Sequence, residues 1–200
     1  MLNFIFSILI LIMSIVAHEV SHGYAAYVQG DNTAKFAGRL TLNPLKHLEW
    51  LGSFFVPVVS YMLGGFIIGW AKPVPFNPYN LRNQRWGEAL VAIAGPVTNI
   101  CIAVFFGLIL RFATLSDPLT YIVSTIVGIN LVLATFNLVP IPPLDGSKIL
   151  FSLFPNKLWE LRRNFERYGF VFVLLFIFFL SQYLSPVVGA EFHLITGLTF

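Results

Sequence analysis

Long apolar runs constrain this chain more than any other feature of its sequence. They lie at about residues 2–29, 51–70, 87–112, 119–139 and 167–188. About 20 residues of α-helix cross the hydrocarbon core of a bilayer, so the first, third, fourth and fifth runs are each long enough to span it. Charged residues make up 10% of the 200 residues, against roughly 25% in a soluble domain. We therefore expect an all-α membrane protein built as a polytopic helical bundle.

The second apolar run and its flanks break this regular pattern. Pro57 and the Gly64–Gly65 pair interrupt the run, which predicts a re-entrant or broken segment, because irregular backbone at membrane depth is tolerated where protein buries it. Before it, polar and apolar residues alternate from Arg39 to Leu42 after Gly38, which predicts a short β-hairpin at the membrane interface. Residues 71–85 contain three prolines and are expected to form an extended loop.

Composition also excludes several classes of protein. The first run has no Lys or Arg before Lys35 and is longer than a signal peptide's apolar region, so we expect a retained helix. The net charge of +3 comes from loops between apolar runs, which leaves no basic surface for nucleic acid. Cys101 is the single cysteine, so no disulfide framework is expected.

The first apolar run contains three ionisable residues in the segment AHEVSHG, namely His18, Glu19 and His22. Residues i and i+4 share one face of a helix, so two imidazoles one turn apart can bind the same metal ion. Glu19 lies on the adjacent strip of the helix, where it can act as a general base, as in the H-E-x-x-H pattern of zinc peptidases. The simpler alternative is a helix end whose polar side chains reach interfacial water.

Burial in lipid favours the metal interpretation. An ionisable side chain at bilayer depth costs about 2.5–3.5 kcal/mol, and a divalent cation would compensate three of them. A catalytic zinc takes three protein ligands, so another residue must contribute. His47 and His193 are better explained as interfacial residues, whereas Asp145 follows the fourth run in NLVPIPPLDG and can reach the same depth. Asp145 could equally be an N-cap of a following helix, and at this point both interpretations stand.

A depth argument links these residues to the topology. His18 lies near the C-terminal end of the first span and Asp145 lies just beyond that of the fourth. A shared site requires both ends to face the same side of the membrane, so residues 51–70 must not cross. All but one of the twelve Lys and Arg residues, Arg111, then fall on one side, which the positive-inside rule makes cytoplasmic. The site is therefore expected inside the bilayer near the cytoplasm.

These motifs together resemble the site-2 protease family of intramembrane zinc metalloproteases. HEVSH (18–22) is similar to that family's H-E-x-x-H helix, NLVPIPPLDG (137–146) to its N-x-x-P-x-x-x-x-D-G segment and AGPVTN (94–99) to its G-P-x-x-N helix. The segments 36–57 and 69–78 resemble the minimal bacterial branch, which lacks a PDZ domain. The resemblance covers about residues 2–154, so we expect one membrane metalloprotease domain over 1–200, with this catalytic core and a C-terminal helix at about 167–188.

The resemblance implies a role for each matching residue. His18, His22 and Asp145 would bind one Zn²⁺ per chain, Glu19 would be the catalytic base and Asn137 would stabilise the oxyanion. Asn99 would lie near substrate, although an interhelical hydrogen bond is as good an explanation. The implied activity is hydrolysis of peptide bonds in transmembrane-helix substrates, near the cytoplasmic side of a bacterial plasma membrane.

Two rival functions use the same His, Glu and Asp cluster. An ion or proton transporter would distribute its polar groups along a path, whereas here they are grouped at one level. A catalytically silent membrane metal-binding protein would have no need of a base such as Glu19.

Overall fold

The computed structural model describes residues 2–49, 72–154 and 159–199, together with residues 55, 59 and 62. Helix dominates these ranges, and they contain no β-strand. The centre consists of α1 (Leu2–Val28), α4 (Gly87–Phe112) and α5 (Asp117–Asn137), which match the first, third and fourth apolar runs. Each of these helices is long and apolar enough to cross a membrane. The expected polytopic helical bundle is confirmed to this extent.

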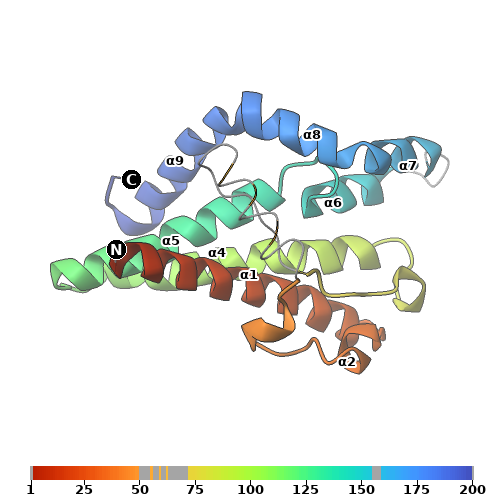
Figure 1. The fold of residues 1–200 in the computed structure, drawn as a ribbon, viewed down its shortest axis with the longest axis horizontal. Helices are drawn as coiled ribbons and strands as arrows, with labels where there is room; N and C mark the ends of the chain where they lie inside the picture. Colours follow the sequence, from red (N-terminus) through yellow and green to blue (C-terminus); the bar gives the residue numbers. More distant parts are fainter. Residues whose placement is uncertain are drawn as a thin grey trace.

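The three long helices pack against one another, and α4 runs antiparallel to α1 and α5 (Figure 1). The C-terminal ends of α1 and α5 therefore lie at the same end of the bundle, together with α2 (Thr33–Phe36) and α6 (Asp145–Leu153). The N-terminus and the α4–α5 turn lie at the opposite end. This is the arrangement that the depth argument requires of His18 and Asp145.

Local sequence explains where the helices near the site begin and end. Pro118 lies in the first turn of α5, where its missing N–H costs nothing. Pro140 follows shortly after the end of α5 and disfavours helical conformation in the residue before it. Residues 138–144 then form turns before α6 begins at Asp145. This short non-helical link directs α6 back towards the bundle.

The outer surface of the bundle suits lipid. Large apolar side chains are exposed along the spans, including Leu9 and Met13 on α1 and Phe105 on α4. Inside, a core formed by α4, α5 and α9 (Leu184–Thr196) contains Ala103, Val127, Leu131, Val188 and Phe192. The chain is thus a multi-pass membrane protein by the length and composition of its helices.

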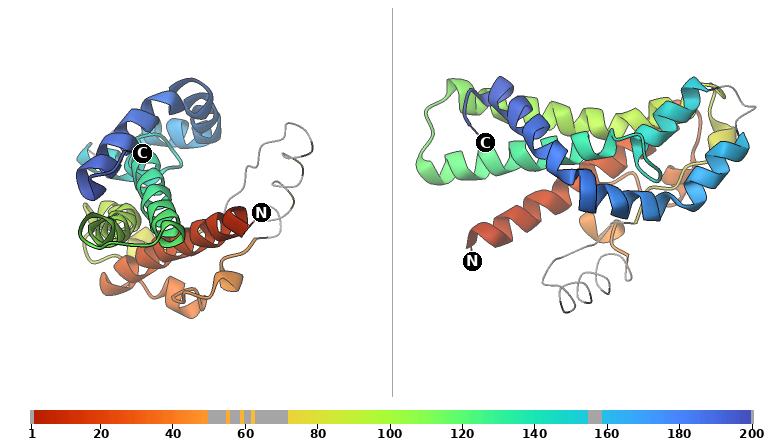
Figure 2. Two further views of the ribbon diagram at one scale, coloured as in Figure 1. Left: turned by 90° about the vertical axis from the view of Figure 1, so that its left-hand side faces the viewer. Right: turned by 90° about the horizontal axis from the view of Figure 1, so that it is seen from above.

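The C-terminal region differs from the single helix expected at 167–188. It contains α7 (Trp159–Arg167), α8 (Gly169–Leu175), a π-helical turn (Phe176–Leu180) and α9, and the two apolar parts meet at 74° (Figure 2). Arg162 of α7 forms a bidentate ion pair with Glu88, in the first turn of α4, through N–O distances of 2.5 and 2.8 Å. The pair anchors α7 at the same end of the bundle as α6.

The β-hairpin predicted near residues 34–42 is wrong. Residues 33–36 form the short helix α2, and Pro44–Lys46 forms a 3₁₀ turn. Arg39 is 7% exposed, and its guanidinium donates to the carbonyls of Lys72 and Pro73. Arg39, expected on a strand, is instead buried and bonded to two backbone carbonyls. The predicted broken segment at 51–70 lies outside the described residues, apart from residues 55, 59 and 62.

A buried carboxylate fastens the loop at residues 72–80 to the end of α1. Asp31 is 0% exposed and accepts hydrogen bonds from the Thr33 hydroxyl, the Asn77 backbone N–H and the Asn80 amide. Burial raises the pKa of Asp31, but these hydrogen bonds outweigh burial and hold the pKa below its ordinary value. The ionised form therefore stabilises this end of the bundle.

We predict that Asp31→Asn lowers thermal stability at neutral pH and that the deficit shrinks in acid. Because the pKa of Asp31 is lower in the folded state, its ionised carboxylate stabilises the fold at pH values above the unfolded-state pKa of about 3.9. This stabilisation is lost as the pH falls to the folded-state pKa. The measurement is thermal unfolding of both proteins in detergent over a series of pH values. A stability difference that does not change with pH would contradict this account.

Candidate metal centre

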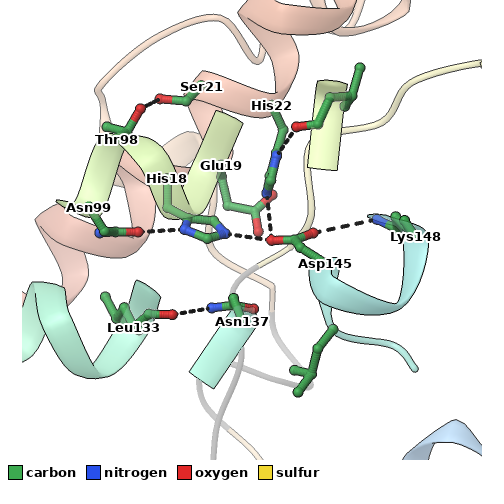
Figure 3. A network of polar contacts seen from close by, with 12 residues as sticks. His18, Glu19, Ser21, His22, Thr98, Asn99, Leu133, Asn137, Asp145 and Lys148 are labelled. Atoms are coloured by element: carbon green, nitrogen blue, oxygen red, sulfur yellow. Dashed lines mark hydrogen bonds and ion pairs between the residues drawn. The ribbon is translucent and has the colours of Figure 1, made fainter. Parts of the chain in front are cut away.

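The candidate site forms where α1, α4 and α6 meet inside the bundle (Figure 3). His18 and His22 project from one face of α1, with ring centroids 4.6 Å apart and ring planes at 88°. Asp145 is the first residue of α6, and the N-cap position belongs to Leu144. His18, His22 and Asp145 are 5%, 8% and 6% exposed, so all three polar side chains are buried.

Three ligand atoms converge at this point. The Nε2 atoms of His18 and His22 lie 3.0 and 3.1 Å from the same carboxylate oxygen, Oδ2 of Asp145. One ligand atom from each residue can be chosen so that all lie within 4.8 Å of one another. Tetrahedral zinc with bonds of about 2.0 Å places its ligand atoms about 3.3 Å apart. The side chains are therefore already close to the spacing that a single metal ion needs.

The hydrogen bond of His22 determines which of its nitrogens carries the proton. Its Nδ1 lies 2.7 Å from the carbonyl oxygen of Val91. A carbonyl only accepts, so Nδ1 must donate, and the neutral ring then directs an Nε2 lone pair towards Asp145. This Nε2 is buried and has no hydrogen-bond partner among the described residues. An unpartnered lone pair facing a carboxylate is repulsive unless a cation lies between them.

His18 is held in the same way from another helix. Its Nδ1 lies 2.5 Å from Oδ1 of Asn99 on α4. An imidazole that donates through Nδ1 presents Nε2 as a ligand, which is how protein partners commonly orient metal-binding histidines. When both rings are neutral and carry their proton on Nδ1, both Nε2 lone pairs face Oδ2 of Asp145, as ligands of one shared metal ion would.

Charge around Asp145 keeps the third group ionised. The ammonium of Lys148 lies 3.7 Å from Oδ1 of Asp145, and its positive charge favours the ionised carboxylate. Two imidazoles and one carboxylate form a ligand set typical of catalytic zinc, which leaves one coordination position for water. The residues present thus fit a single zinc ion.

Glycine makes room for the two rings. A Cβ on Gly95 of α4 would lie 2.5 Å from Nε2 of His18 and 2.6 Å from Cε1 of His22. A Cβ on Gly146 would lie 2.2 Å from the carbonyl oxygen of Leu138, so the residue after Asp145 packs directly on the backbone beyond α5. The sequence analysis did not place Gly95 against the two imidazoles.

Glu19 approaches the cluster from the same helix, and Figure 3 draws its carboxylate beside His22 and Asp145. Its Oε2 accepts a hydrogen bond of 2.8 Å from the backbone N–H of Val74. The loop that carries Val74 is held by Arg39 through Lys72 and Pro73. The carboxylate is therefore fixed by a tertiary contact that no motif in the sequence reveals.

The other sequence candidates lie apart from the three converging atoms. The amide of Asn137 donates to the carbonyl of Leu133, one turn earlier in α5. His47 contacts the carbonyl of Thr41, and His193 contacts that of Leu198, so neither belongs to the cluster. Asn99 bonds both to His18 on α1 and to Asn130 on α5, and so makes interhelical hydrogen bonds, one of the two roles that the sequence left open.

Comparison with known proteins decides the family. The model of Peptidase family M50 matches residues 6–121 and 113–180. The chain belongs to peptidase family M50. The site-2 proteases are this family, so the resemblance inferred from the three motifs is confirmed, and the chain is a zinc metalloprotease. No solved structure matches it significantly.

Curated relatives agree with this assignment. Three whose names begin "Putative zinc metalloprotease" are YwhC of Bacillus subtilis (strain 168), Rip2 of Mycolicibacterium smegmatis and MJ0611 of Methanocaldococcus jannaschii. YwhC is 41% identical over 92% of this chain and 85% of its own length. Rip2 is 30% identical over 83% and 64% of the two chains, and MJ0611 is 35% identical over 72% of each.

We predict that Gly95→Ala strongly lowers the zinc content of the purified M50 protease. The new methyl group would overlap both imidazoles, so they could no longer direct Nε2 at Asp145. Gly189→Ala on α9 is a matched control, because a Cβ there meets no atom within 4 Å. Zinc per chain, measured by elemental analysis, should fall in the first variant only. Equal zinc content in Gly95→Ala and wild type would contradict the packing argument.

Proposed function

We propose that this M50 protease hydrolyses peptide bonds of transmembrane helices, within the bilayer and near its cytoplasmic side. One observation carries the proposal: two imidazole lone pairs and a carboxylate meet in the interior of a bundle of membrane-spanning helices, with Glu19 beside them. The whole chain would act as one catalytic domain, with the site built from the core at about residues 2–154.

His18, His22 and Asp145 would hold one zinc ion per chain. When bound, zinc supplies Lewis acidity, which lowers the pKa of a water molecule towards about 7 and polarises the carbonyl under attack. A single carboxylate among the ligands keeps much of the ion's charge uncompensated. The Val91 and Asn99 contacts would keep both rings in the tautomer that leaves Nε2 free.

Glu19 would act as the general base and then as the general acid. Its carboxylate would take a proton from the attacking water and pass it to the leaving amine. The N–H of Val74 would keep the carboxylate pointed at the site through both steps.

Asn137 would donate a hydrogen bond to the developing oxyanion, a contact worth about 2.7–4 kcal/mol for comparable donors. An amide nitrogen carries two hydrogens, so the bond to Leu133 leaves one for this purpose.

The position of the site inside the bundle indicates the class of substrate. A site reached from the lipid phase meets helices, and a helix buries its peptide carbonyls in its own hydrogen bonds, so the substrate must unwind before cleavage. The excess of Lys and Arg at the end that carries α2, α6 and α7 supports a cytoplasmic position for this end. The similarity to bacterial relatives supports the bacterial plasma membrane as its location.

The rival functions have less support. A proton or ion transporter would need further ionisable groups along the bundle, whereas His18, His22 and Asp145 form one compact group. A silent metal-binding protein would not require a base fixed beside the ligands.

We predict that Glu19→Gln retains zinc but slows cleavage by a factor of about 10²–10⁴. Glutamine can still accept the Val74 hydrogen bond, so the loop stays in place while the base is lost. The assay uses purified protein reconstituted in vesicles with a panel of single-span substrates, with cleaved bonds mapped by mass spectrometry.

Glu160→Gln is the matched control, because Glu160 is exposed on α7, outside the site. It should cleave at the wild-type rate, and the mapped bonds should lie in the cytoplasmic half of the substrate helix. Equal cleavage by Glu19→Gln and wild type would refute the role of the base. Bonds mapped only in the opposite half would refute the proposed side.

A further inference from the structure

A chain of buried amide groups extends from the candidate metal centre into α5. Asn99 and Asn130 are both 0% exposed, although each lies within a membrane-spanning helix. The amide nitrogen of Asn99 donates to Oδ1 of Asn130 at 2.7 Å. The amide nitrogen of Asn130 in turn donates to Oγ of Ser14 at 3.0 Å and to the carbonyl of Ile126 at 2.8 Å.

The direction of this chain is set at its far end. The Ile126 carbonyl can only accept, so Asn130 must turn its amide nitrogen towards it and its Oδ1 towards Asn99. Asn99 must then present its nitrogen to Asn130 and its Oδ1 to His18. An oxygen in that position requires a proton on Nδ1 of His18, so the neutral ring that binds a metal presents its lone pair on Nε2.

We propose that Asn130 is a positioning residue for the metal centre, fixing the tautomer and ring orientation of His18 through Asn99. This inference rests on the proposed zinc site and extends it to a residue on α5 that does not touch the ligands. In a low-dielectric interior an unsatisfied amide is costly, so the fully bonded arrangement strongly excludes the flipped one. The chain of hydrogen bonds thereby links α4 and α5 to His18 on α1.

The energetic consequence is expected in metal binding. Residues that orient a metal-binding histidine through its second nitrogen typically change metal affinity about 10–100-fold when replaced. Asn130→Leu keeps the side-chain size but removes both the acceptor for Asn99 and the donor for Ile126. The Asn99 amide nitrogen would then keep only its long bond of 3.4 Å to the Ser14 carbonyl. Asn99 could rotate this nitrogen towards His18, which would favour a proton on Nε2 and block the ligand atom.

A conservative variant separates orientation from packing. In this buried position the carboxyl of Asn130→Asp would be neutral, because a charged one is strongly disfavoured away from water. A neutral carboxyl can donate to Ile126 and accept from Asn99, so it reproduces the original direction of the chain. Thr125→Val is the control, because the Thr125 hydroxyl also donates to a carbonyl one turn back in α5 but takes no part in the chain from Asn130 to His18.

The first test measures zinc affinity of the full-length protein in detergent by competition with a chelator. We expect Asn130→Leu to lose about 10–100-fold in affinity, and Asn130→Asp and Thr125→Val to stay close to wild type. Wild-type affinity in Asn130→Leu would overturn the proposal. An equal loss in Asn130→Leu and Asn130→Asp would also overturn it, since the effect would then be one of packing alone.

The second test needs no zinc and reads the wild-type protein, with one variant used only to identify signals. Nitrogen NMR of metal-free wild-type protein labelled in histidine reports the tautomer, with the His18 signals identified by their loss in His18→Gln. We expect a proton on the Nδ1 that faces Asn99, and a His18 ring with no proton on Nδ1 would overturn the proposal. Failure of wild type to bind zinc would refute the proposed function, whereas the tautomer result would still decide this inference.

Discussion

Three lone pairs directed at one point inside a helical bundle are the constraint on which the rest of this structure depends. Two come from imidazole nitrogens and one from a carboxylate, and each is aimed by a second contact on the same side chain or element. Water solvates such groups in a soluble enzyme, but the interior of a membrane bundle offers little, so a cation becomes the natural partner. The short connection after α5 and the absence of a side chain at Gly95 both make this convergence possible.

Different helices and loops of the bundle contribute different parts of the site. Helix α1 carries two ligands and the base on one turn and a half, so their relative positions follow from helix geometry alone. Helix α4 supplies no ligand, but its carbonyl at Val91 and its amide at Asn99 aim both rings. The loop at residues 72–80 holds Glu19 and is itself held by Asp31 and Arg39. Each contact joins segments far apart in the sequence, which makes the site sensitive to the whole fold.

Much of this was predictable from the sequence, for identifiable physical reasons. Backbone groups in lipid must bond within their own segment, so 20 apolar residues specify a helix almost without regard to context. The spacing of His18 and His22 and the matching depth of Asp145 then followed from helix rise and the parity of crossings. The hairpin expected at Arg39–Leu42 is wrong because alternation of polar and apolar residues cannot show that Arg39 bonds to the backbone carbonyls of a distant loop. The hydrogen bond between Asn99 and Asn130 and the contact of Val74 with Glu19 could not be predicted. They depend on how each helix is rotated about its axis and on where the loop at residues 72–80 runs, and no local sequence pattern specifies either.

The central claim is that His18, His22 and Asp145 bind one zinc ion, and zinc-edge X-ray absorption on the purified protein tests it most directly. The account predicts one zinc per chain with two imidazole nitrogens and carboxylate or water oxygen at about 2.0–2.2 Å, and no sulfur. A sulfur neighbour at about 2.3 Å, a single imidazole, or protein that takes up no zinc would contradict it.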